Sequence, residues 1–342
     1  MKALRFITIG SALVLAVGCR KGGGYLDDHM AHMSALDMAA PRSASESNRQ
    51  QQDNLNFPPS NDRATARLNS SPRHGEWVKV AWEPGSVDSL MAWIVYPSTS
   101  NTKTPVVVVV HEIFGLSSWV RGVADQVAAD GFIAIAPDLE SRVRGGPSTV
   151  EMTGDSARKL IGGVLPAERN KGIVAVANYA MSQASAAPRY AVIGYCWGGQ
   201  TVWAHAVHGG TTGYAGGVAF YGAFPYNNPA TPPMVATPNA DSLAKINKPL
   251  MLLNGSRDAR IATSMPTIDS MMKARKKDYV GVNYLNASHG FLRQQDDPHF
   301  VRDSTAADGR RRDTETELGD VAATKDGWPR TIAFLKKNLG VK

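Results

Sequence analysis

The chain has very little cysteine. Its 342 residues include only Cys19 and Cys196, so a fold stabilised by several disulfide bonds is excluded. A single Cys19–Cys196 disulfide is an alternative, but it would require the N-terminal leader to stay on the chain. We therefore expect the two cysteines to have separate roles.

Long hydrophobic runs are also scarce. The one at the N-terminus, residues 6–17, follows Lys2 and Arg5 and ends at Ala16-Val17-Gly18-Cys19. It is too short to span a membrane as a mature helix and is typical of an export signal that closes on a lipobox. We predict a lipoprotein signal peptide over residues 1–18 with lipidation at Cys19; an ordinary secretory signal and an uncleaved anchor are the alternatives. We therefore expect an exported, membrane-anchored lipoprotein of the bacterial cell envelope, in the periplasm or at the outer membrane. Cys19 is followed by Arg20 and not by the Asp that favours retention in the inner membrane of Gram-negative cells, which favours the outer membrane in such a host.

Runs of basic residues are missing as well. The net charge is +7, but the closest approach to a run, Arg310 to Arg312, is followed at once by Asp313, so nucleic acid is not an expected partner. A mild attraction for anionic substrates or surfaces is compatible with this charge.

Large apolar residues are sparse from residue 19 to residue 73, where Gly, Ser, Asn, Gln, Asp and Ala dominate. This composition predicts a flexible tether. Its Asp, His and Met side chains have no spacing typical of a closed metal site, so we interpret them as part of a solvated polar linker, with a soft or borderline metal as the alternative. These side chains are Asp27, Asp28, His29, Met30, His32, Met33 and Met38.

From residue 74 to residue 342 the pattern predicts one α/β domain with a mostly parallel central sheet and helices on both faces. Residues 105–110 are wholly apolar, which is typical of a strand covered on both sides. The other expected strands are 76–82, 90–96, 132–136, 190–193, 217–221, 249–254 and 280–285. The expected helices are 119–129, 167–181, 200–207, 265–276 and 328–339. The charged stretch 294–327 is interpreted as a surface excursion.

Cys196 lies in the sequence Gly194-Tyr-Cys-Trp-Gly-Gly199, directly after an apolar strand. A strand that runs into small-x-Cys-x-Gly is typical of a nucleophile elbow with sulfur in place of oxygen. Taken alone, Cys196 is also compatible with a buried structural cysteine. Chemistry at this thiol would need a base to accept its proton and an acid to orient that base.

Two later strand ends supply candidates for these roles. Asp258 follows the strand 249–254, and His289 follows the strand 280–285, so the chain order is nucleophile, acid, histidine, as in α/β-hydrolases. His205, His208 and His299 are alternative bases, and Asp258 alone would also suit a turn. Glu112 follows the strand 105–110, in a loop where such enzymes take a backbone N–H of the oxyanion hole.

These motifs resemble the dienelactone hydrolase family, which has an α/β-hydrolase fold. The matching blocks are V-V-V-V-V-H-E-I-F-G, A-P-D-L-E-S-R, G-Y-C-W-G-G, N-G-S-R-D and A-S-H-G-F-L-R. The resemblance implies Cys196 as nucleophile, His289 as base and Asp258 as orienting acid. It also implies that Glu112 holds and activates the resting thiol, that Ile113 and Trp197 form the oxyanion hole through their backbone N–H groups, and that Arg142 and Arg293 bind a substrate carboxylate. Glu140 stands where family members often have an aromatic residue, and it is a possible internal partner for Arg142.

The sequence as a whole predicts a lipid-anchored hydrolase that cleaves a small-molecule ester or lactone, one that can carry a carboxylate, through a thioester on Cys196. The reaction needs no metal and no organic cofactor. A broader carboxylesterase or thioesterase is an alternative, and so is a surface lipoprotein that uses the fold as a binding scaffold.

Overall fold

The computed structural model describes residues 54–98, 103–146, 154–227, 237–295 and 314–341. The predicted leader, Cys19 and the polar segment with Asp27 to Met38 lie outside these residues. Within them, no helix combines the length and apolarity that crossing a membrane requires.

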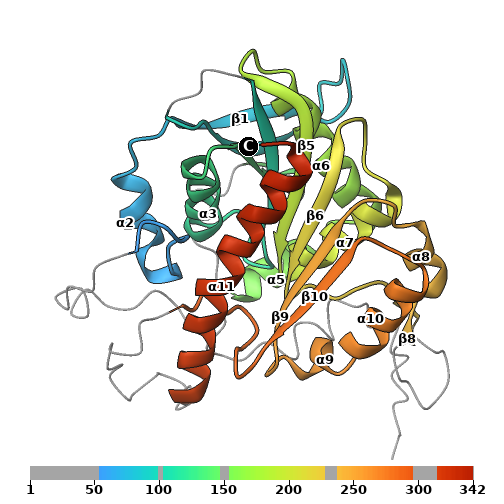
Figure 1. Ribbon diagram of the computed structural model, residues 1–342. Coiled ribbons are helices and arrows are strands. Elements are labelled where there is room, and N and C mark those ends of the chain that lie inside the picture. Colours follow the sequence, from blue (N-terminus) through green and yellow to red (C-terminus); the bar gives the residue numbers. More distant parts are fainter. Residues whose placement is uncertain (1–53, 99–102, 147–153, 228–236, 296–313, 342) are drawn as a thin grey trace, which may run out of the picture. The chain divides into compact units, whose positions relative to one another are not determined.

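An eight-stranded sheet in the order β1-β2-β4-β3-β5-β6-β9-β10 forms the centre of the structure (Figure 1). The strands β1 and β2 are antiparallel to their neighbours, and all further pairs are parallel. The eight strands are β1 (Gly75–Ala81), β2 (Ser89–Val95), β3 (Thr104–Val110), β4 (Ile133–Asp138), β5 (Ala186–Tyr195), β6 (Tyr214–Phe220), β9 (Leu250–Gly255) and β10 (Tyr279–Tyr284). This is the predicted fold, a mostly parallel sheet in an α/β-hydrolase arrangement.

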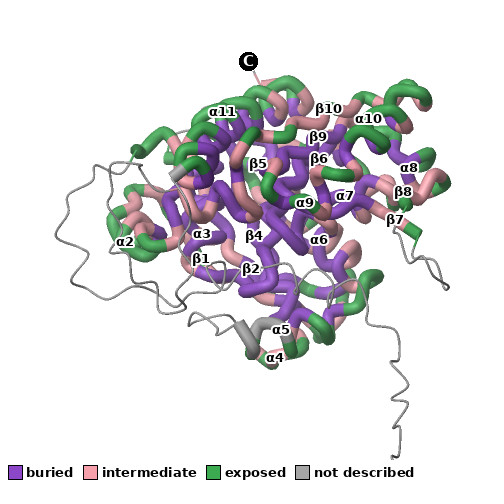
Figure 2. The backbone as a smooth tube through the Cα atoms, turned by 90° about the horizontal axis from the view of Figure 1, so that it is seen from below, coloured by how far each residue is buried: buried purple, intermediate pink, exposed green. Residues whose placement is uncertain are grey.

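Helices cover both faces of the sheet. On one face lie α3 (Ser118–Ala129) and α11 (Thr314–Leu339), and on the other lie α6 (Pro166–Met181) and α7 (Trp197–His208) (Figure 1). Every residue of β3 is buried, as expected for a strand between two helical layers. Figure 2 shows the buried residues concentrated in the central strands and in the helix faces that touch them, while the outer helix faces are exposed.

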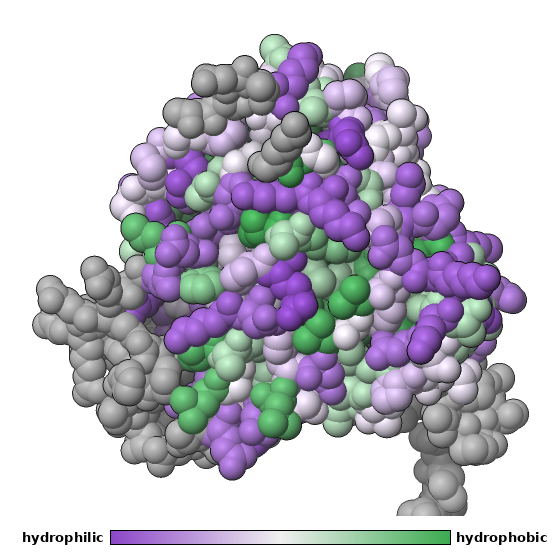
Figure 3. Space-filling model, in the orientation of Figure 1, coloured by the Kyte–Doolittle hydropathy of each residue, from purple (hydrophilic) through white to green (hydrophobic). Residues whose placement is uncertain are grey.

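Shorter elements connect this framework. They are the 3-10 helix η3 (Asn61–Arg63), the helices α2 (Ala64–Asn69), α4 (Ser141–Arg144), α5 (Gly154–Gly162), α8 (Ala240–Lys245), α9 (Ala259–Ala262) and α10 (Met265–Ala274), and the strand pair β7 (Tyr226–Asn227) and β8 (Thr237–Pro238). The surface seen in Figure 3 is mainly hydrophilic, with small separate hydrophobic patches.

Two segments differ from their predicted structure. Residues 54–73, assigned to the tether, are ordered and include η3 and α2, because polar contacts and buried prolines fix them against α3. Residues 314–327, assigned to a surface excursion, form the first half of α11. The charged composition of this segment did not indicate a helix, because polar residues such as Asp320 and Thr324 occupy its buried face.

Candidate active site

The candidate active site lies at the carboxyl ends of the parallel strands. Because these strands point the same way, the residues that come after them share one edge of the sheet. The residues are Glu112 after β3, Glu140 after β4, Cys196 after β5, Tyr221 after β6, Asp258 after β9 and His289 after β10.

Cys196 occupies the tight turn between β5 and α7. Its backbone φ is 56°, a left-handed value that is strained for a residue with a side chain. A Cβ on Gly194 would lie 2.4 Å from the carbonyl oxygen of Gly198, and a Cβ on Gly198 would lie equally close to the carbonyl of His111. Only glycine fits at these two positions, and the turn that they permit presents the buried sulfur at the start of α7.

His289 contacts both its predicted partners. Its Nδ1 lies 2.7 Å from Oδ2 of Asp258, and the Cys196 side chain is hydrogen-bonded to the imidazole. Burial alone would lower the pKa of His289, but the charges of Asp258 and Cys196 and the hydrogen bonds to both raise this pKa well above its usual value. The imidazole is therefore suited to hold a proton taken from sulfur.

The loops that carry Asp258 and His289 are tied together by the backbone. Arg257 N–H donates to the Ala287 carbonyl at 3.0 Å, and Ser256 N–H donates to the Tyr284 carbonyl at 2.8 Å. From α11, buried Asp320 accepts bonds from the Ser288 N–H and hydroxyl at 2.6 and 2.9 Å. Asp320 thus positions the residue next to His289, a role that the sequence did not predict because the charged pattern of this segment indicated a surface excursion.

His111 and Trp197 bring the loop after β3 against the start of α7. Their rings stack at a centroid distance of 5.4 Å. His111 donates through Nδ1 to the Glu112 carbonyl and accepts at Nε2 from the Leu139 N–H, and burial lowers its pKa to about 4, so the ring is neutral. The predicted oxyanion-hole residues lie on these two adjoining segments: Ile113 in the loop after β3 and Trp197 at the start of α7. The N–H of Trp197 has no acceptor within the helix, because it belongs to the first helical turn.

Glu112 and Arg293 form an ion pair. Arg293 Nε lies 3.1 Å from Glu112 Oε1, with the carboxylate almost fully buried, and the guanidinium stacks on the Phe114 ring at 4.5 Å. The hydroxyl of buried Tyr221 interacts electrostatically with Glu112, Cys196 and Arg293, and its ring lies 5.0 Å from that of His289. Tyr221 therefore lies between Cys196 and the Glu112–Arg293 ion pair. The sequence analysis did not select it, although its position directly after a parallel strand could have indicated a site residue.

Arg142 has a different position from Arg293. Its guanidinium pairs with Asp88 and Glu168 and stacks over Trp82 at 4.0 Å, which engages it with the β1–β2 connection and the start of α6. Glu140, considered as its partner, pairs with Arg144 at 3.4 Å. The structure thus brings together all the predicted catalytic side chains and Arg293, and holds Arg142 in another ion-pair group.

Two of the alternative bases, His205 and His208, lie in α7. His205 is buried in α7, where its ring bonds to the Tyr190 hydroxyl at 2.9 Å and to Asn170 Oδ1 at 2.6 Å. Burial lowers its pKa to about 3, so it is a neutral structural histidine. His299 lies outside the described residues. Among the described residues, no cluster of His, Cys, Asp or Glu has the geometry to hold a metal ion.

The sheet order, the elbow after β5 and the acid and histidine after later strands define an α/β-hydrolase. The sequence model of the Dienelactone hydrolase family matches residues 90–339. The chain belongs to this family, and it is an ester or lactone hydrolase of the dienelactone hydrolase (carboxymethylenebutenolidase) type.

Individual relatives agree with this assignment. A protein of Salmonella typhimurium, provisionally named a carboxymethylenebutenolidase, is 29% identical over 264 residues, which cover 76% of this chain and 87% of the relative. A Synechocystis protein with the same provisional name is 32% identical over 204 residues, covering 56% of this chain and 77% of the relative. The crystal structure of a provisionally named dienelactone hydrolase from Klebsiella pneumoniae superposes with a TM-score of 0.58 at 25% identity, covering 77% of this chain and 99% of that one.

Proposed function

We propose that the protein is a lipid-anchored hydrolase that cleaves an ester or lactone through a thioester on Cys196. The observation that carries this proposal is the buried Cys196–His289–Asp258 arrangement, with the 2.7 Å contact between the histidine and the acid. A scaffold that had lost turnover would have no need to keep a strained cysteine bonded to an acid-oriented imidazole.

The proposed reaction has two steps. The Cys196 thiol passes its proton to His289 Nε2, and the sulfur attacks the carbonyl carbon while the N–H groups of Ile113 and Trp197 hold the developing oxyanion. The imidazolium then returns the proton to the leaving alkoxide, and the thioester forms. In the second step His289 takes one proton from water while the water oxygen attacks the thioester carbon. The C–S bond then breaks, the imidazolium returns its proton to sulfur, and the product leaves as a carboxylic acid that ionises in solvent.

Glu112 and Arg293 support a substrate that carries a carboxylate. An incoming carboxylate can take over the guanidinium of Arg293, so the Glu112 carboxylate loses its ion-pair partner and becomes a second acceptor for the Cys196 proton beside His289. This would raise the reactivity of Cys196 when an acidic substrate is present. Arg142, with its two carboxylate partners, is less suited to this role.

A substrate panel tests the proposal. Lactones, acidic esters and neutral aryl esters would be assayed with the wild type, with Cys196→Ala and with Cys196→Ser. We expect Cys196→Ala to lower hydrolysis by about three orders of magnitude or more with an unchanged circular dichroism spectrum. Full activity of this variant would refute the cysteine mechanism, and preference for neutral esters would favour the broader carboxylesterase.

The anchor is tested separately. After detergent phase partitioning, we expect the wild type in the detergent phase and Cys19→Ala in the aqueous phase, because the lipid is attached to the Cys19 thiol alone. Equal partitioning of both proteins would contradict lipidation at Cys19.

A further inference from the structure

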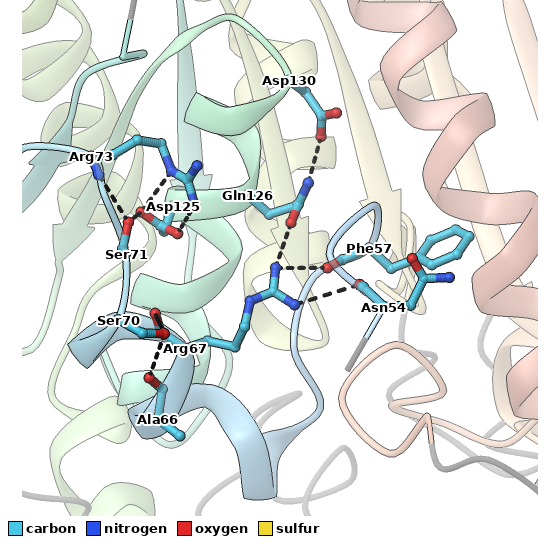
Figure 4. Close-up of polar contacts among 10 residues, drawn as sticks. All are labelled: Asn54, Phe57, Ala66, Arg67, Ser70, Ser71, Arg73, Asp125, Gln126 and Asp130. Carbon is cyan, nitrogen blue, oxygen red and sulfur yellow. Dashed lines mark hydrogen bonds and ion pairs between the residues drawn. The ribbon is translucent and has the colours of Figure 1, made fainter. Parts of the chain in front are cut away.

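The residues just before the hydrolase domain form an ordered strap, residues 54–73. Arg67 bonds to Gln126 Oε1 at 2.7 Å and to the Phe57 carbonyl, and the Arg73 guanidinium pairs with Asp125 at 2.5 Å (Figure 4). The Pro59 carbonyl accepts a bond from Trp119 Nε1 at 3.0 Å. The strap is thereby fixed along α3, although it precedes the part of the chain that matches the family.

One strap residue reaches the candidate active site. Asn61 Oδ1 accepts bonds from Arg293 Nε at 3.1 Å and Nη2 at 2.8 Å, and the Asn61 N–H donates to the Arg293 carbonyl at 2.9 Å. Beside this contact, Gln295 Nε2 donates to the Pro58 carbonyl at 2.7 Å. Asn61 therefore holds both the backbone and the side chain of the arginine that pairs with Glu112.

We propose that Asn61 is a positioning residue, which fixes the Arg293 guanidinium beside Glu112 and so sets the selectivity of the Cys196 site for anionic substrates. The proposal rests on the function proposed above for Cys196. Two bonds to one neutral amide oxygen restrain the guanidinium without adding a second negative charge beside that of Glu112, which a substrate carboxylate would have to displace. A carboxylate at this position would instead compete with the substrate for Arg293.

Substitutions of the Asn61 amide therefore separate the effect of its charge from the effect of its hydrogen bonds. Asn61→Asp keeps the shape and adds a negative charge at 2.8 Å from Nη2, whereas Asn61→Ala removes the acceptor and leaves the charge of the site unchanged. Asn69, the exposed last residue of α2, offers matched controls in the same strap: Asn69→Asp and Asn69→Ala.

Alkylation of Cys196 tests the proposal without requiring turnover. Iodoacetate and iodoacetamide have nearly the same size but differ by one negative charge, and mass spectrometry of the Cys196 peptide separates its reaction from that of Cys19. We expect Asn61→Asp to lower the iodoacetate rate relative to the iodoacetamide rate by about fivefold or more. We expect Asn61→Ala to lower it by about twofold and both Asn69 variants to leave it unchanged.

Ester kinetics give the second measurement. In Asn61→Asp the KM for an acidic ester should rise by about tenfold relative to the KM for a matched neutral ester, whereas both Asn69 variants should leave this ratio unchanged. An unchanged alkylation ratio in Asn61→Asp, or the same change in Asn69→Asp, would overturn the role of Asn61. If the ratio shifts as expected but the wild type hydrolyses no ester, only the proposed function fails; a Cys196 that reacts with neither reagent contradicts both.

Discussion

At the residue scale, the behaviour of His289 depends on Asp258. The acid orients Nδ1 at 2.7 Å and, together with Cys196, outweighs the effect of burial and keeps the pKa of the imidazole high. A protonated imidazole beside sulfur would stabilise a thiolate, so in the proposed mechanism Asp258 influences the reactivity of Cys196 through His289. This electrostatic chain makes a pH dependence the natural test.

We expect Asp258→Asn to lower kcat/KM for ester hydrolysis by about three to four orders of magnitude, because the imidazole loses both its orientation and its charge partner. The pKa of His289 should fall. Iodoacetamide should therefore alkylate Cys196 more slowly than in the wild type at pH values where the wild-type imidazole is protonated, and the difference should shrink as the pH rises and that imidazole loses its proton. Asp241→Asn, at an exposed site in α8, is the control; identical pH profiles for all three proteins would exclude this role for Asp258.

At the element scale, the short helix α4 continues the active-site edge after β4. It closes over two buried carboxylates, Asp138 and Glu140, which share Arg144. Burial and the nearby charge of Asp138 raise the pKa of Glu140 to about 8, although the charge of Arg144 acts in the opposite direction. This raised pKa favours the protonated, neutral form of Glu140 at neutral pH, hydrogen-bonded rather than ion-paired to Arg144.

Glu140→Gln tests this state through stability. The folded protein keeps the Glu140 proton up to about pH 8, whereas the unfolded chain loses it near its ordinary pKa of 4.5. Stability from this group is therefore fully present below pH 4.5 and is lost as the pH rises towards 8, by about 1.4 kcal/mol per unit. Glutamine cannot ionise, so urea unfolding at several pH values should show the variant gaining stability relative to the wild type as the pH rises. Parallel profiles, like those expected for the exposed control Glu76→Gln, would show that Glu140 is ionised at neutral pH.

At the scale of the whole molecule, the sequence predicted the features that strand periodicity determines and little of the structure that depends on long-range contacts. Cys196, Asp258 and His289 were identifiable because each comes after an apolar strand, and parallel strands end at one edge. Asn61 and Asp320 were not, because each lies in a polar segment without apolar periodicity and acts on a residue far away in the chain. For the same reason, the sequence analysis assigned residues 54–73 to a tether.

The boundary of the folded domain is therefore itself testable. A chain that starts at residue 54 should unfold at the same temperature as one with the full N-terminus, whereas a chain that starts at residue 74 should unfold lower. The second truncation removes Arg73 from Asp125, a carboxylate that is only 4% exposed, and the Pro59 carbonyl from buried Trp119. Breaking a buried ion pair costs about 3–5 kcal/mol while the remaining charge stays buried; some of this cost is recovered where removal of the strap lets water reach Asp125, and we expect Tm to fall by about 6 °C.

The point variant Arg73→Ala keeps the rest of the strap and isolates the charge. Differential scanning calorimetry should place its Tm between those of the two truncated chains, because Ser71 still donates to Asp125. Equal Tm values for the chains that start at 54 and 74 would show that residues 54–73 add no stability, as expected for a flexible tether. A loss confined to the shorter chain would instead make residues 54–73 part of the hydrolase domain, and Asn61 would then hold Arg293 from inside the fold.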